Sequence, residues 1–202
     1  MGYLLMRAAA CGRAIGSLSA IAYVAAASFL TAQSMERPVN ERGPADAPVT
    51  VVEVCSYGSE VCSRLNIVVS GVLDEFGERV RLVFHHVAGD DAAAGLLRYR
   101  AALSAGRQGQ FWPMHDLLMA NRQRETRADV LAMAHQLGLD SERFRADLDS
   151  PETIAAAESG RDEAAAASGA AAPALIVNGR SLAVRSEAKD VRAAIRAALG
   201  VR

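Results

Sequence analysis

The sequence predicts an α/β fold in which a strand-helix-strand unit and a strand-strand-helix unit enclose a block of helices. Three observations support this: a β-branched run at residues 49–55 that leads into helical periodicity, helical patterning over residues 90–168, and two apolar strands joined by Asn178-Gly179. The 202 residues carry a formal net charge of −1. This length fits one domain with an appendage, and the charge gives no support to a nucleic-acid partner.

The N-terminal part has the pattern of an export segment. Residues 14–32 carry no charge and follow Arg7 and Arg13. The length of this run lies near the lower limit of a membrane span, about 17 to 25 residues, and above the usual signal-peptide core of about 7 to 15. We therefore expect residues 1–32 to be a signal peptide or an inner-membrane anchor, with the domain outside the cytoplasm, in a periplasm. Residues 33–48 are polar with three prolines and are expected to be a linker.

The domain is expected to begin with a parallel unit. Residues 49–55, "VTVVEVC", form a β-branched run typical of a buried central strand. Apolar residues then recur at helical spacing, and Ser59 is a suitable N-cap, so a helix is expected to begin there. Residues 79–86, "RVRLVFHH", predict a second strand. Strand, helix and strand in this order imply a right-handed parallel unit.

The rest of the domain is expected to be a helical insertion followed by a hairpin and a closing helix. The insertion covers about residues 90–168 in four or five segments. The stretch "PALIVNGRSLAV" contains Asn178-Gly179, the dipeptide best suited to a type I′ hairpin turn. Apolar residues every four positions within 186–199 predict the last helix. Over residues 49–202, this order is a thioredoxin-like topology with a helical insertion.

Three separated blocks carry a resemblance to a known family. They are "GPADAPVTVVEVCSYGSEVC", "AALSAGRQGQFWPMHDLLMAN" and "AAAPALIVNGRSL". In this order they resemble the DsbA-like thiol-disulfide oxidoreductases of the bacterial envelope, over essentially the whole domain. The resemblance implies protein or peptide substrates in the envelope. It also implies that Pro173 follows a cis peptide bond and that Ala172, just before it, contacts extended substrate.

The Cys-x-x-Cys motif of that family is incomplete in this chain. Ser59 stands at the position of the attacking cysteine and Cys62 at the position of the second. A serine hydroxyl cannot form a disulfide, and it is not acidic enough to replace a thiolate without a neighbouring base. The first interpretation is therefore a family member that binds proteins or peptides through the loop at Ala172 and Pro173 without dithiol turnover.

Two alternatives use the cysteines differently, and none of the three interpretations calls for a cofactor. In the second interpretation Cys62 is a monothiol or glutathione-dependent nucleophile beside Ser59, because the first turn of a helix favours a thiolate. Kappa-class glutathione transferases resemble this arrangement, since they have a serine at the same motif position. In the third, Cys55 and Cys62 form a structural disulfide, which an oxidising compartment favours and which requires Cα atoms within about 7 Å.

The remaining chemistry-bearing residues have structural explanations. His85 and His86 are adjacent on a strand, so their side chains point to opposite faces and cannot easily share an ion, and no metal site is expected. His115 and Trp112 are three apart on a helix and are expected to pack where the insertion meets the core. Cys55, unless it is bonded, is expected to be a small core residue.

Overall fold

The computed structural model describes residues 38–87, 92–169 and 172–201. Residues 1–32, expected to be a signal peptide or anchor, lie outside this part of the chain. Within the described part, none of the helices combines the length and the apolar character that crossing a membrane requires.

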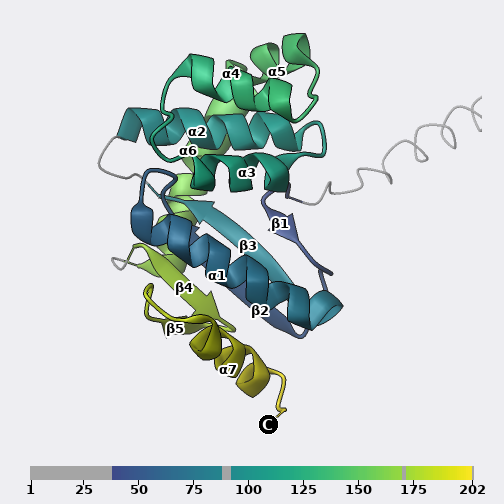
Figure 1. Cartoon of the computed structure of the whole chain (residues 1–202), viewed down its shortest axis with the longest axis vertical. Coiled ribbons are helices and arrows are strands. Elements are labelled where there is room, and N and C mark those ends of the chain that lie inside the picture. The colour runs from purple at the N-terminus through teal and green to yellow at the C-terminus, as the bar shows by residue number, and fades with distance from the viewer. Residues whose placement is uncertain (1–37, 88–91, 170–171, 202) are drawn as a thin grey trace, which may run out of the picture. The chain divides into compact units, whose positions relative to one another are not determined.

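A five-stranded mixed sheet forms the centre of the domain (Figure 1). Its strand order is β1-β3-β2-β4-β5. The central pair, β2 and β3, is parallel, as the strand-helix-strand order predicts, and all other pairs are antiparallel. The strands are β1 (Glu41–Arg42), β2 (Val49–Cys55), β3 (Val80–His86), β4 (Ala174–Val177) and β5 (Arg180–Leu182).

Helices cover both faces of the sheet and one end of it. In Figure 1, α1 and α7 lie in front of the strands, α6 runs behind them, and α2 to α5 stack beyond one end of the sheet. The five helices of the insertion occur where the sequence predicts them. The helices are α1 (Glu60–Phe76), α2 (Ala92–Gly106), α3 (Phe111–Ala120), α4 (Arg127–Gln136), α5 (Ser141–Leu148), α6 (Pro151–Ser168) and α7 (Ala188–Ala198), with a short 3-10 turn at Gly77–Arg79.

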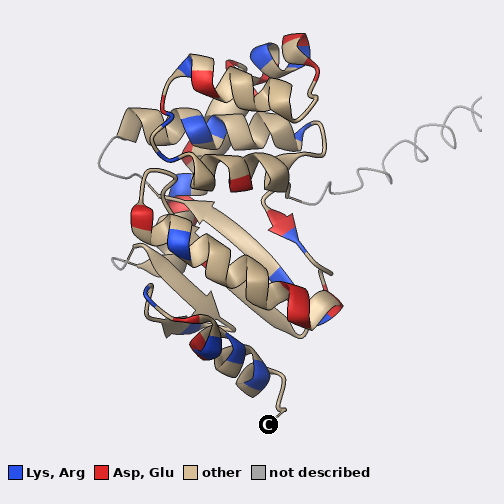
Figure 2. Cartoon of the chain, viewed as in Figure 1, with Lys and Arg blue, Asp and Glu red and all other residues tan. Residues whose placement is uncertain are grey.

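The alternation of side chains along β2 divides the core into two layers. Val51 and Cys55 belong to the main apolar cluster, which also contains the buried face of α1. Val54 belongs to a smaller cluster with Ala164 of α6. Figure 2 shows few charged residues on β3 and β4 and several basic residues on α7. The strands therefore supply apolar surface to both layers, as expected for a sheet buried on both faces.

The hairpin turn is held to the start of β2 by one side chain. Asn178 and Gly179 have φ values of 44° and 80°, the positive values that a type I′ turn requires at both central positions. The Asn178 Oδ1 atom accepts a hydrogen bond from the Thr50 amide at 2.7 Å, and its Nδ2 donates to the Pro48 carbonyl at 3.1 Å. The turn therefore fixes β4 beside the central strand.

The segment before β2 differs from the expectation. The sequence predicts a linker over residues 33–48, but Glu41–Arg42 form β1 and pair with β3. The buried Asn40 side chain donates to the Phe84 carbonyl at 2.8 Å. A strand of two residues has too few positions to show a period, so this pairing leaves no pattern in the sequence.

Candidate functional site

The turn between β2 and α1 places a serine at the helix start and joins the two nearby cysteines. Ser59 is the N-cap of α1, and its Oγ accepts from the Cys62 amide at 3.3 Å. Cys55 ends β2, Cys62 lies in the first turn of α1, and their Cα atoms are 5.6 Å apart in a disulfide. The Ser56 amide donates to the Cys62 Sγ at 3.4 Å. The motif thus presents a hydroxyl at the N-cap and a disulfide behind it.

Burial limits what this disulfide can do. Both cysteines have no exposed surface, whereas Ser59 is partly exposed. Disulfide exchange requires a thiolate to reach one of the two sulfurs, so an inaccessible bond exchanges poorly. In this structure Cys62 is not the free monothiol of the second interpretation, because its sulfur is bonded to Cys55.

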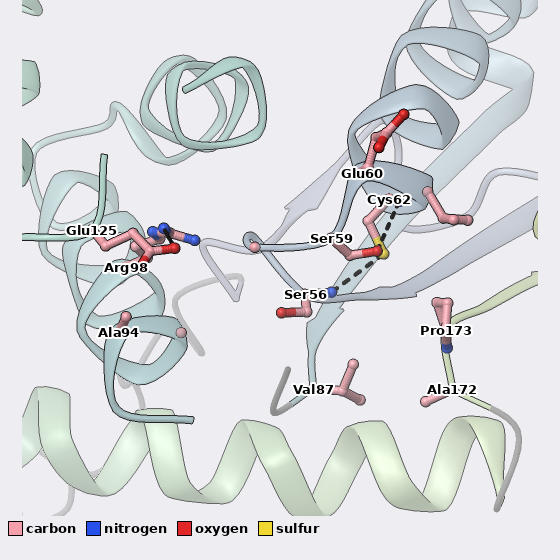
Figure 3. Close-up of a pocket in the computed structure, with 13 residues that line it drawn as sticks. Ser56, Ser59, Glu60, Cys62, Val87, Ala94, Arg98, Glu125, Ala172 and Pro173 are labelled. Carbon is pink, nitrogen blue, oxygen red and sulfur yellow. Dashed lines mark hydrogen bonds and ion pairs between the residues drawn. The ribbon is translucent and has the colours of Figure 1, made fainter. Parts of the chain in front are cut away.

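A cavity of about 600 Å³ opens beside this turn (Figure 3). Figure 3 shows Ser56 and Ser59 between Arg98 and Glu125 on one side and Ala172 and Pro173 on the other. The cavity is lined by Ser56, Gly58, Ser59, Glu60, Val61, Cys62, Val87, Ala94, Gly95, Arg98, Glu125, Ala172 and Pro173. The cavity therefore brings together Ser59, Cys62, Ala172 and Pro173, all four of the residues that the sequence suggests for catalysis or substrate binding.

The proline loop borders the cavity just before β4 begins. The Ala172–Pro173 peptide bond is cis, as the resemblance implies. Ala172 is exposed, whereas β4 itself is buried and pairs with β2 and β5 on either side. An approaching chain can therefore reach Ala172, while the strand that follows is already paired.

The opposite side of the cavity comes from the helical insertion and carries an ion pair. Arg98 of α2 donates from Nη2 to the Glu125 Oε1 at 2.7 Å and to the Arg122 carbonyl at 2.6 Å. The Arg98 side chain is 1% exposed and the Glu125 side chain 44% exposed. A buried cation and an accessible anion thus share one wall of the cavity.

A hydrogen-bonded network of buried side chains begins at Tyr57, within the turn between β2 and α1. The Tyr57 hydroxyl and the Asn66 Oδ1 atom each lie 3.1 Å from a ring nitrogen of His115. Asn66 donates from Nδ2 to Asp116, so its oxygen accepts from His115 Nε2–H, and His115 Nδ1 accepts from Tyr57. Burial lowers the pKa of His115 to about 3, so the ring is neutral. His115 packs where the insertion meets the core, as predicted, with the Trp112 ring 5.2 Å away.

The two adjacent histidines of β3 are separated by the strand. His86 is buried and stacks between Tyr57 and Tyr99, with ring centroids 5.4 and 5.1 Å away. Burial lowers its pKa to about 3. His85 lies 3.5 Å from Glu163 of α6. In the described residues, no cluster of three or more histidine, cysteine or acidic side chains is arranged to hold a metal ion.

A buried acid, Glu53, lies on the same strand as Cys55 of the disulfide. Glu53 is two residues before Cys55 on β2, so both side chains point to the same face of the sheet. Glu53 is fully buried, and within the described residues neither carboxylate oxygen has a hydrogen-bond partner. Burial raises its pKa to about 8, Arg42 opposes this shift, and Asp116 adds to it. The carboxyl group is therefore protonated in the folded protein at neutral pH.

Two residues of this region are not anticipated from the sequence, although each leaves a signal. Glu53 interrupts an otherwise apolar run that predicts a buried strand. Arg98 follows Gly95 by three positions and precedes Ala102 by four, and these residues share the buried face of α2. A charged residue inside an apolar stripe marks a buried charge that needs a partner.

Comparisons with known proteins place the chain among thioredoxin-fold proteins. A family model described as Thioredoxin matches residues 37–197. A Na(+)/H(+) antiporter NhaA from Herminiimonas arsenicoxydans is 34% identical over 156 residues, which are 77% of this chain and 25% of that protein. The chain thus spans about a quarter of the length of this curated relative.

Solved structures share the fold. A thioredoxin-like oxidoreductase from Silicibacter pomeroyi superposes with a TM-score of 0.67 and 27% identity, covering 80% of this chain and 92% of that one. The thiol-disulfide exchange protein alpha-DsbA2 from Wolbachia pipientis gives a TM-score of 0.69 at 14% identity, covering 90% of this chain and 99% of that one. The second likeness is one of fold alone.

Proposed function

This chain belongs to the thioredoxin family, with the fold of the DsbA-like thiol-disulfide oxidoreductases, and from that premise we propose that it binds extended protein or peptide segments without dithiol turnover. The observation that carries the proposal is the position of Ser59. It occupies the partly exposed helix start where an exchange enzyme needs a thiolate, while both nearby sulfurs are buried in a bond with each other.

The cavity supports binding of an extended chain. It has backbone accessible at Ala172 on one side and a polar wall at Arg98 and Glu125 on the other. An extended peptide can add to an accessible backbone edge through main-chain hydrogen bonds, and pockets for its side chains give selectivity. In this proposal the disulfide between Cys55 and Cys62 stabilises the turn. The proposal thus combines binding without dithiol turnover, the first interpretation of the sequence, with a structural disulfide, the third.

The monothiol alternative is weaker. A thiolate at Cys62, acting on glutathione or another disulfide, would first require reduction of the bond to Cys55. We therefore do not retain glutathione as a partner. We do not propose that this chain transports ions, because it spans only about a quarter of the length of the antiporter relative.

The proposed location is the cell envelope. The charge-free run at residues 14–32 behind Arg7 and Arg13 supports export or anchoring with residues 49–202 outside the cytoplasm. An oxidising compartment is also where a disulfide such as that between Cys55 and Cys62 persists. The proposed partners are accordingly protein or peptide segments of that compartment.

Peptide binding tests the proposal. The probe is a fluorescently labelled, cysteine-free peptide of about ten residues, which is about 33 Å long when extended, at about 3.3 Å per residue. We expect saturable binding to the chain, and Ala172→Trp to weaken it by about tenfold or more, about 1.4 kcal/mol, because the large ring covers the accessible backbone. Ala132→Trp, at an exposed position of α4, is the matched control. Equal affinity of the two variants would reject this site.

A further inference from the structure

The buried arginine of the cavity wall is fixed in place, whereas its carboxylate partner is not. Arg98 is held by α2, and its Nη2 also donates to the Arg122 carbonyl. Glu125 comes from the segment between α3 and α4 and is 44% exposed. The cation is thus a permanent part of the wall, and the anion can leave toward solvent.

The guanidinium of Arg98 keeps bonding capacity that the described protein groups do not use. Its Nε atom is buried and has no hydrogen-bond partner within the described residues. A guanidinium has five N–H donors, arranged to match a carboxylate with two parallel bonds. One Glu125 oxygen and one carbonyl leave this capacity incompletely filled. A carboxylate that enters from the cavity can pair with Arg98 more fully.

Arg98 also lies beside the turn at which a bound peptide would pass. A Cβ added at Gly58 would lie 3.4 Å from Arg98 Nη1, so the guanidinium is close to the residue just before Ser59. Figure 3 shows the guanidinium on the cavity side of α2, facing the turn. Glu60, another carboxylate of the lining, pairs with Arg64 at 3.3 Å and with Arg122 at 3.9 Å rather than with Arg98. Among the residues that line the cavity, Arg98 is therefore the cation that a ligand can reach once Glu125 moves away.

We propose that Arg98 selects peptides with an acidic side chain, and that Glu125 occupies Arg98 when no peptide is bound. This inference rests on the proposed function and names its substrate class. A buried guanidinium without a carboxylate is costly, so Glu125 keeps the empty cavity stable. A glutamate or aspartate of the peptide exchanges with Glu125 and leaves the charge on Arg98 balanced. Peptides without an acidic side chain bind to the proline loop, but Arg98 adds nothing to their affinity.

The test uses capped, labelled peptides with one glutamate placed at each position in turn, and matched peptides with glutamine instead. For the best position, the glutamate peptide should bind the chain about tenfold more tightly, because its carboxylate can form two parallel bonds with the Arg98 guanidinium where Glu125 forms one. Glu125→Gln should tighten binding of the glutamate peptide and leave the glutamine peptide unchanged, because it removes the competing carboxylate. Glu142→Gln, on the exposed face of α5, is the control.

A double variant and a free carboxyl terminus complete the test. Arg98→Gln with Glu125→Gln should abolish the glutamate preference and keep binding of the glutamine peptide. Glutamine peptides with a free C-terminal carboxylate should bind like their amidated forms; a preference for the free terminus would assign Arg98 to chain ends and overturn the side-chain proposal.

The outcomes separate this inference from the proposed function. If the glutamate and glutamine peptides bind equally, or if Glu125→Gln leaves the preference unchanged, the assignment of Arg98 is wrong and the peptide site stands. If no peptide binds, the proposed function fails, and the inference fails with it.

Discussion

The two walls of the cavity differ in how freely their functional groups can meet a ligand. The sulfur wall, formed by Ser56, Ser59 and Cys62, keeps both cysteines of the disulfide buried, and its Ser59 is partly exposed. The arginine wall, formed by Arg98 and Glu125, fixes a buried cation and leaves its anion exposed. Under the proposed function, the first wall does not take part in exchange, and the second wall meets the ligand.

In the proposed function, this difference is how a thioredoxin-like fold binds a ligand without exchange chemistry. The reactive position of the family is a single residue at a helix start, so serine there removes the attacking sulfur without changing the helix. Ser59 even keeps the cap, through its bond from the Cys62 amide. The cavity and the proline loop lie beside this helix start.

The largest expected effect concerns the buried acid behind the sulfur wall. The pKa of Glu53 is raised from 4.5 to about 8. Between these values the folded chain holds a proton on Glu53 that the unfolded chain releases, so the contribution of Glu53 to the free energy of unfolding falls as pH rises, by up to about 1.4 kcal/mol per pH unit. We expect Glu53→Gln to remove this contribution, so that the difference in the free energy of unfolding between the wild type and the variant changes with pH by this slope. Urea unfolding at several pH values from about 5 to 7.5 measures it.

The contribution of histidines does not disturb this measurement. The lowered pKa values of His86 and His115 stabilise the fold above the unfolded value of 6.5, and this contribution is lost as pH falls toward about 3. Its sign is opposite to that of Glu53, and it is present in both proteins, so it cancels in the comparison. Parallel pH profiles of the wild type and Glu53→Gln would show that Glu53 is not protonated in the fold.

A smaller effect is expected from the disulfide of the sulfur wall. The two cysteines are seven positions apart, and the chain-entropy model gives about 2.5 kcal/mol for a loop of this length. Adding dithiothreitol should lower the free energy of unfolding by about that amount. Cys55→Ala with Cys62→Ala should not respond to the reductant. Both proteins should carry Cys11→Ser, so that the third cysteine cannot pair. If dithiothreitol leaves the free energy of unfolding of the wild type unchanged, the disulfide does not stabilise the fold.

Most of the fold can be predicted from the sequence because each element except the two-residue strand β1 has a local signal. The run at 49–55, the cap at Ser59 and the Asn178-Gly179 turn all lie where the structure has them. The Arg98–Glu125 pair joins residues far apart in the sequence, and no periodicity predicts which acid meets a buried arginine. The pairing of Cys55 with Cys62 stays open in the sequence as well, because it depends on how sharply the chain turns after β2.

Insulin reduction tests most directly the claim that Ser59 and the buried bond remove exchange chemistry from this fold. In a Cys11→Ser background, we expect the wild-type chain and Cys55→Ala to give only background turnover. Adding Ser59→Cys to Cys55→Ala restores a Cys-x-x-Cys pair at the start of α1, and turnover should rise by about tenfold or more, about 1.4 kcal/mol in barrier. Turnover by the wild-type chain equal to that of the double variant would contradict the account.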